Sequence, residues 1–231
     1  MYTAASMAMR HGADVQKAMT AGLLHDCGKY CDVNEQILLC RKHHIKLSDA
    51  ELEVPALIHA RLGAYFAEYE YGITDSEILD AITYHTTGRP AMTMIEKIVY
   101  LADYIEPGRK KIPGLAEVRT AAFDDIDTAV CMTAESTLAF LKRAGRKVDP
   151  MTEKTCQYYK NKAAISCKGI SDNPERRTNY GTVKTYGTSC LSALDDKKGE
   201  DIQVIDISQF PSLQIILSLQ TETVKARYVH W

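Results

Sequence analysis

The sequence has no excess of charge of either sign and no long apolar run. Its 28 Lys and Arg residues stand against 30 Asp and Glu residues, for a net charge of −2. That balance excludes a global positive field able to recruit nucleic acid, so we predict no direct nucleic-acid binding by the folded part. The longest apolar runs, such as residues 98–102, end at a charge well before the roughly 20 residues that a membrane helix needs. We therefore predict no membrane partner.

The cysteines show none of the common patterned arrangements. Seven are present, an odd number, and no two of them form a Cys-x-x-Cys pair. We expect no secretory leader ahead of them. We therefore predict reduced thiols in a cytoplasmic protein.

The composition is that of an ordinary globular protein, and the apolar residues recur with a helical period. The chain has 231 residues, 45% of them hydrophobic and 25% charged, which fits one domain with an appendage or two small domains. Up to about residue 160 the apolar residues recur at helical spacing, and almost nothing alternates like a strand. The predicted fold is all-α, with helices that include residues 93–105 and 124–144. Asp14, Asp75 and Asp125 stand where N-caps are expected.

Five polar side chains interrupt apolar helical faces and should point inward: His25, Asp26, His59, His85 and Asp103. A single buried histidine is ordinarily a core residue that donates to a backbone carbonyl. Five such coincidences favour a shared role. Imidazole nitrogen together with carboxylate oxygen suits divalent iron, manganese or zinc, and an aspartate can bridge two ions. A two-metal site is therefore predicted.

Four short segments carry a family resemblance. They are residues 24–30 (Leu-His-Asp-Cys-Gly-Lys-Tyr), 58–60 (Ile-His-Ala), 84–90 (Tyr-His-Thr-Thr-Gly-Arg-Pro) and 101–109 (Leu-Ala-Asp-Tyr-Ile-Glu-Pro-Gly-Arg). These segments resemble the bacterial YqeK family of HD-domain metal-dependent phosphohydrolases, over residues 1 to about 160. The resemblance implies an HD-domain helical bundle that cleaves diadenosine tetraphosphate, a dinucleoside polyphosphate, symmetrically into two ADP.

The resemblance also implies individual roles. His25 and Asp103 would bind one metal ion, His59 and His85 the second, and Asp26 would bridge the two. The family centre is di-iron, although this donor set also accepts manganese or another divalent ion. The residues that would contact the polyphosphate are Lys29, Thr86, Gly88, Arg89 and Arg109. Asp26, Lys29 and Arg89 are the predicted catalytic residues, because the two cations would neutralise charge developing on the transferred group. Cys27 is interpreted as a packing residue.

The beginning of the sequence departs from the family pattern. YqeK-like proteins have one more metal-binding histidine, in an Arg-x-x-His stretch on the helix that leads into the segment matching residues 2–6, and this sequence starts after it. We therefore expect an N-terminally truncated relative with a more weakly held first metal ion. Two alternatives stay open: an HD phosphohydrolase acting on another nucleotide polyphosphate, and an inactive domain with a ribosome-associated interaction role.

The part of the chain after the HD domain is expected to contain three segments. The HD domain should cover residues 1–162, followed by a linker or non-native segment at 163–190. Residues 191–208 resemble the start of the ribosome silencing factor (Iojap-like) family, and 209–231 read as an out-of-frame continuation, with a strand expected at 202–207. We predict a short α/β fragment with poor order, for which the large ribosomal subunit would be a partner only if the fragment were complete.

Overall fold

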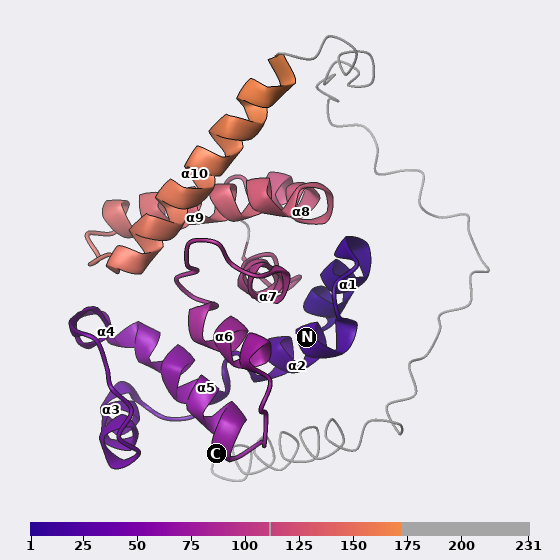
Figure 1. Ribbon diagram of the computed structural model, residues 1–231. Helices are drawn as coiled ribbons and strands as arrows, with labels where there is room; N and C mark the ends of the chain where they lie inside the picture. Colours follow the sequence, from indigo (N-terminus) through magenta and orange to yellow (C-terminus); the bar gives the residue numbers. More distant parts are fainter. Residues whose placement is uncertain (111, 172–231) are drawn as a thin grey trace. The chain divides into compact units, whose positions relative to one another are not determined.

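The computed structural model of the protein describes residues 1–110 and 112–171 (Figure 1). Every regular element in these ranges is helical, which confirms the all-α prediction. The helices are α1 Tyr2–His11, α2 Val15–Leu24, the 3-10 turn η1 Cys27–Lys29, α3 Val33–Lys42, α4 Asp49–Glu53, the 3-10 turn η2 Pro55–Leu57, α5 Ile58–Tyr69, α6 Ser76–Tyr84, α7 Met94–Tyr104, α8 Leu115–Asp124, α9 Ile126–Arg143 and α10 Pro150–Ser171.

Short polar side chains begin several of these helices. The carboxylates of Asp14, Asp75 and Asp125 accept hydrogen bonds from backbone amides in the first turns of α2, α6 and α9, as predicted. Thr93 and Glu96 form a reciprocal capping box at the start of α7. Each contact satisfies amides that the first helical turn leaves without a partner, which is worth about 1 kcal/mol per cap.

Helix α7 is the central element of the bundle. Its residues 95–102 are all buried, and it packs against α1, α2, α6 and α9, which surround it in Figure 1. A helix that is covered on all sides has to be apolar around most of its circumference, and the run Ile98, Val99, Tyr100 and Leu101 meets that requirement. Because α7 is held so tightly, the residues at its C-terminal end have a well-defined position.

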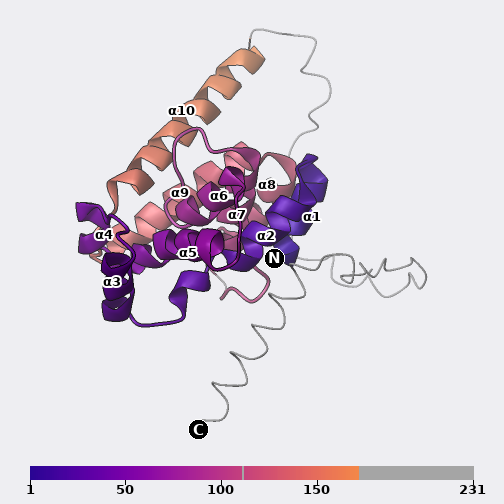
Figure 2. The same ribbon diagram turned by 60° about the horizontal axis from the view of Figure 1, so that its bottom comes forward.

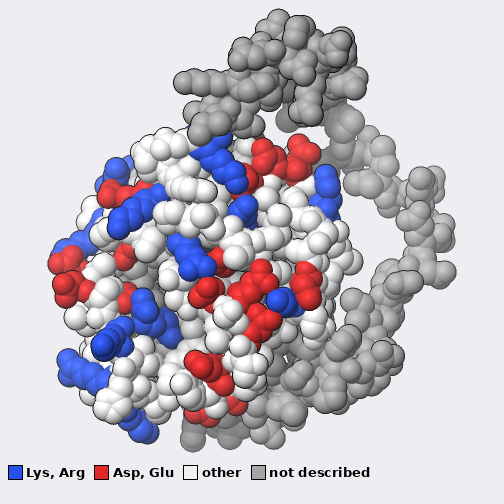
Figure 3. Space-filling model, in the orientation of Figure 1, with Lys and Arg blue, Asp and Glu red and all other residues white. Residues whose placement is uncertain are grey.

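The short helices α3 and α4 belong to an outer layer beside α5, which both views show (Figures 1 and 2). Cys40 from α3 is fully buried with Ile58 and Leu62 from α5, and further apolar side chains from both segments pack around them. This small cluster anchors the first turn of α5. The space-filling view shows basic and acidic side chains interspersed over one face of the molecule (Figure 3).

Helix α10 continues through Ser171, so the segment expected to be a linker from residue 163 begins within a helix. No helix in the described ranges is both long enough and apolar enough to cross a membrane. The remaining linker, the strand expected at 202–207, the silencing-factor-like fragment at 191–208 and the out-of-frame segment at 209–231 lie outside the described residues.

Candidate metal centre

The five predicted metal-binding residues arrive at one place from the ends of four helices. His25 caps the C-terminus of α2 and Asp26 follows it, leading into η1. His59 lies in the first turn of α5, His85 caps the C-terminus of α6, and Asp103 lies in the last turn of α7. Helix ends have backbone groups free of the internal ladder, so side chains there can be directed across the bundle without breaking a helix.

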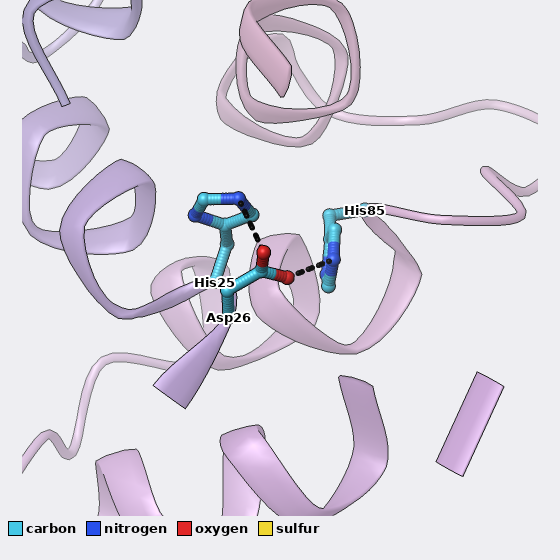
Figure 4. Close-up of side chains that lie close together, drawn as sticks. All are labelled: His25, Asp26 and His85. Atoms are coloured by element: carbon cyan, nitrogen blue, oxygen red, sulfur yellow. Dashed lines mark ion pairs between the residues drawn. The ribbon is translucent and has the colours of Figure 1, made fainter. Parts of the chain in front are cut away.

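The side chains meet around one carboxylate. The Oδ1 atom of Asp26 lies 3.3 Å from His85 Nε2 and 3.5 Å from His59 Nε2, and its Oδ2 atom lies 3.6 Å from His25 Nε2. His25 Nε2 is in turn 3.9 Å from Asp103 Oδ1. Figure 4 shows the Asp26 carboxylate pointing between the rings of His25 and His85. All five predicted residues are therefore brought together, with Asp26 in the middle.

The three histidines share one hydrogen-bonding arrangement. The Nδ1 atom of each lies next to the carbonyl oxygen three residues earlier: 2.9 Å to Gly22 for His25, 2.6 Å to Ala56 for His59, and 2.7 Å to Ile82 for His85. A carbonyl can only accept, so these contacts assign the proton to Nδ1 and leave Nε2 with its lone pair facing the cluster. Orienting contacts of this kind are typical of histidines that bind a metal ion.

Two features of the cluster call for a cation. His59 Nε2 and His85 Nε2 are 3.2 Å apart, so two lone pairs would face each other unless a positive charge lies between or beside them. The buried Oδ1 atom of Asp26 accepts no aligned hydrogen bond from the described residues, although the Lys29 ammonium lies 2.7 Å away. Nitrogen and carboxylate donors with unmet bonding capacity fit a divalent metal ion. His25, Asp26 and His85 offer ligand atoms that all lie within 4.8 Å of one another, close enough to share such an ion.

The shifted pKa values of His25, Asp26 and His59 favour the deprotonated form of each at neutral pH. Burial, followed by the charge of neighbouring His85, lowers the pKa of His59 to about 4, and the same two causes lower the pKa of His25. Burial alone would raise the pKa of Asp26, but the contacts with His85, His25 and Lys29 outweigh it and hold that pKa well below its usual range. These three donors are thus in the forms that a metal ion needs at neutral pH.

The low pKa of His59 predicts that the metal-free protein is sensitive to acid. In the unfolded chain His59 takes up its proton near pH 6.5, whereas in the folded protein it does so only near pH 4. Between these values the unfolded state binds more protons, so the free energy of unfolding should fall by about 3 kcal/mol as the pH drops from 6.5 to 4. Urea unfolding of the chelator-treated protein across this range measures the fall.

A matched variant isolates the contribution of His59 to this pH dependence. His59→Gln keeps a polar side chain but has no ring to titrate, so its unfolding free energy should change less steeply between pH 6.5 and 4. An identical slope in the variant and the parent protein would contradict the assignment to His59.

Two glycines allow the segment that carries Asp26 to lie directly on α5. A Cβ atom on Gly28 would collide with the carbonyl oxygen of His59 and would lie 2.8 Å from the amide of Gly63. The backbones of η1 and α5 therefore touch here, which brings Asp26 beside His59. Sequence reasoning did not assign this role to Gly28, because only the crossing of the two segments shows it. The Cys27 thiol donates to the Gly63 carbonyl at 3.3 Å, in agreement with a packing role.

The residues predicted to contact polyphosphate are placed unequally. Lys29 Nζ lies 2.7 and 2.8 Å from the two oxygens of Asp26. Arg109 donates to the backbone oxygen of Asp103 at 2.6 Å and to its carboxylate at 3.2 Å. Both cations therefore border the cluster. A cavity of about 370 Å³ is lined by His25, Asp26 and Asp103, together with Met1, Thr3 and Glu106.

Arg89 has other partners. Its guanidinium forms ion pairs with buried Glu96 at 2.6 Å and with Asp80 at 2.9 Å, and lies 4.5 Å from the centre of the Tyr84 ring. These contacts tie the segment after α6 to the start of α7. A phosphate contact by Arg89 stays a prediction, and it would require Arg89 to exchange at least one of these partners.

The other two predicted phosphate residues also lie in the segment after α6. The amide of Gly88 donates to the Tyr84 carbonyl at 2.8 Å and so closes the end of α6, and a phosphate contact by Gly88 stays a prediction. Gly88 has a left-handed φ of 62°, and a Cβ atom there would lie 2.7 Å from Thr155 of α10. Glycine is therefore needed at this position for the turn and the packing. Thr86 lines a separate cavity next to α4.

Comparison with known proteins identifies the family. The HD domain family model matches residues 1–108. A curated relative from Bacillus subtilis (strain 168), named symmetrical bis(5'-nucleosyl)-tetraphosphatase, is 44% identical over 154 residues, which cover 66% of this chain and 81% of the relative. A relative of the same name from Halalkalibacterium halodurans is 43% identical and matches over 80% of its length. The chain belongs to the HD-domain family of symmetrical bis(5'-nucleosyl)-tetraphosphatases.

A solved structure of another HD-domain protein supports both fold and family. The crystal structure of a predicted HD superfamily hydrolase involved in NAD metabolism from Clostridium acetobutylicum aligns with a TM-score of 0.66 and 37% identity. The alignment covers 69% of this chain and 84% of the other chain. The helical arrangement that brings the five residues together is thus the HD-domain fold, as the resemblance implied.

Proposed function

We propose that this protein hydrolyses diadenosine tetraphosphate symmetrically, producing two ADP. The observation that carries the proposal is the centre itself: three Nε2 lone pairs and a carboxylate oxygen without an aligned hydrogen bond converge at four helix ends. Relatives that share the fold and bear the tetraphosphatase name supply the reaction class. Water adds to one of the two inner phosphorus atoms, and the bond from that phosphorus to the oxygen joining the two inner phosphates breaks.

The five residues divide into two sets of metal-binding groups. His25 and Asp103 would hold one ion, His59 and His85 the other, and the Asp26 carboxylate has one oxygen directed to each pair. Bound divalent ions supply Lewis acidity to the phosphate oxygens and make a water molecule acidic enough to attack near neutral pH. We assign iron as the native ion, with manganese as the alternative that this donor set also accepts.

Three further side chains near the centre, those of Lys29, Arg109 and Cys27, bear on how the substrate is held and attacked. Lys29 and Arg109 border the cluster, so they can hold and orient the inner phosphates; the Arg109 fork suits two phosphate oxygens, and Lys29 acts as a point charge. Burial raises the pKa of the Cys27 thiol to about 12, so this thiol stays protonated. Cys27 is thus unsuited to act as a nucleophile, in keeping with direct attack by water.

Product analysis tests the proposal. We expect the full chain, supplied with ferrous iron or Mn²⁺ under reducing conditions, to convert diadenosine tetraphosphate to ADP alone. Chelation should abolish turnover and readdition of the ion should restore it, because the proposed reaction needs the Lewis acidity of the bound ions. AMP together with ATP would contradict symmetrical cleavage. Turnover of other nucleotide polyphosphates but not of this substrate would favour the alternative substrate class.

A further inference from the structure

Helix α8 supplies none of the predicted site residues, yet the half-buried side chain of its Arg119 reaches the segment that follows Asp103. The Nε atom of Arg119 donates to the backbone oxygen of Ile105 at 3.1 Å, and its Nη2 atom donates to that of Glu106 at 2.8 Å. The guanidinium forms no ion pair within the described residues. Because the guanidinium is planar and its donors have a fixed geometry, it fixes the directions of both carbonyls at once.

Both carbonyls lie directly after α7, which ends at Tyr104. Carbonyl groups at the C-terminal end of a helix have no partner within the helix, and the helix dipole makes this end partly negative. Arg119 supplies donors and a positive charge there, and Arg109 does the same at the Asp103 carbonyl, at 2.6 Å. The two arginines therefore complete the end of α7, one from within the segment and one from α8.

One of these carbonyls also forms the turn that carries Arg109. The backbone oxygen of Glu106 accepts the backbone amide of Arg109 at 3.1 Å, in addition to Nη2 of Arg119. This turn brings the Arg109 side chain back to the Asp103 carboxylate, which it contacts at 3.2 Å. Glu106 and Asp103 both line the 370 Å³ cavity. Arg119 thus holds the turn from which Arg109 reaches the border of the cavity.

The backbone of α8 gives Arg119 a firm position that does not depend on the centre. This helix packs against α1 and α9. Its buried side chains are Leu115, Val118 and Ala122, and Val118 immediately precedes Arg119. A side chain that projects from such a packed helix can hold a neighbouring turn in place, because the packing fixes its point of attachment.

We propose that Arg119 is a positioning residue for substrate binding: it holds the turn at 105–109 so that Arg109 presents its guanidinium to the inner phosphates beside Asp103. This inference rests on the proposed function. Since Arg119 acts through Arg109, its effect should disappear in a protein that has no Arg109 side chain. Since Arg109 would contact the phosphates both before and during the reaction, the loss of Arg119 should weaken binding more than it slows the chemical step.

A double-mutant cycle on the full chain with Mn²⁺ present tests this proposal, and calorimetric titration with ADP makes the test independent of turnover. Arg119→Gln is neutral and has no guanidinium fork, so it should weaken ADP binding about tenfold. The KM for diadenosine tetraphosphate should rise by a similar factor, while kcat changes by less than about twofold. Arg109→Ala should also weaken ADP binding, and the addition of Arg119→Gln to Arg109→Ala should weaken it no further.

Two more variants complete the test. Arg119→Lys keeps the charge but has no planar fork, so it should weaken ADP binding in the same direction by a smaller factor and can replace Arg119→Gln in the cycle if that variant does not fold. Arg41→Gln makes the same change at an exposed position in the last turn of α3 and should bind ADP as the parent protein does.

Three results would overturn the role of Arg119. They are a parent protein that binds no ADP, an Arg119→Gln variant that is less stable but binds ADP with full affinity, and additive effects of the Arg119 and Arg109 substitutions. A parent protein that shows the coupling in ADP binding but does not cleave the dinucleotide would count against the proposed function and would support the role of Arg119.

Discussion

Asp26→Asn will reduce the turnover of diadenosine tetraphosphate on the order of a thousandfold, the largest loss that we expect from a single isosteric change. Both oxygens of the Asp26 carboxylate face histidine Nε2 atoms, between 3.3 and 3.6 Å away. The amide that replaces the carboxylate is neutral and presents N–H groups on one side, so it can neither bridge two cations nor balance their charge. The loss of one bridging anion removes several kcal/mol of the stabilisation that a two-metal site supplies, which corresponds to about three decades in rate.

Two measurements separate this loss from unfolding. Metal content should fall from two ions towards one or none per chain, while circular dichroism shows an intact helical fold. Asp124→Asn provides the matched control, because Asp124 is an exposed aspartate at the end of α8 and is remote in sequence from every metal-binding residue. Its turnover should equal that of the parent protein. Full activity and metal content in Asp26→Asn would rule out Asp26 as the bridge.

The sequence predicted best those features that depend only on residues close together in the chain. Asp14, Asp75 and Asp125 cap their helices because a short carboxylate reaches the amides of the next turn whatever surrounds it. His59 and His85 were identified by their position on apolar faces, which indicates burial, and they are 5% and 2% exposed. The grouping of all five polar residues followed from the same reasoning, since a polar group on a buried face requires a partner.

Features that depend on how segments cross one another were beyond the sequence. The family resemblance implied that Arg89 contacts phosphate, but it gave no sign that Glu96 of the next helix lies within 2.6 Å of the Arg89 guanidinium. The segment expected to be a linker begins at residue 163, but α10 continues through Ser171. The contact of Gly28 with α5 has no sequence signal at all, since a glycine before a lysine is equally typical of an exposed turn.

Gly28→Ala should therefore damage the centre without altering any metal-binding residue. The added methyl group would occupy the space of the His59 carbonyl oxygen, and a backbone atom cannot move aside as a flexible side chain does. Separating η1 from α5 should cost about 1–3 kcal/mol of stability, as overpacking commonly does. It would also move Asp26 away from His59, and a displacement of about 1 Å at a reacting centre can cost roughly a hundredfold in rate. Thermal unfolding and kcat/KM, measured where both proteins are folded, report the two effects separately.

Gly72→Ala is the matched control, because it introduces the same methyl group at a position where nothing lies within 4 Å. Gly72 has a left-handed φ of 68°, so alanine there should cost about 1 kcal/mol of stability through backbone strain while turnover stays unchanged. If Gly28→Ala lowers stability as Gly72→Ala does but retains full turnover, the contact between η1 and α5 only supports the fold. If turnover falls while the metal-binding side chains are all present, the distance between Asp26 and His59 is itself a requirement of the reaction, and the two glycines at the crossing set it.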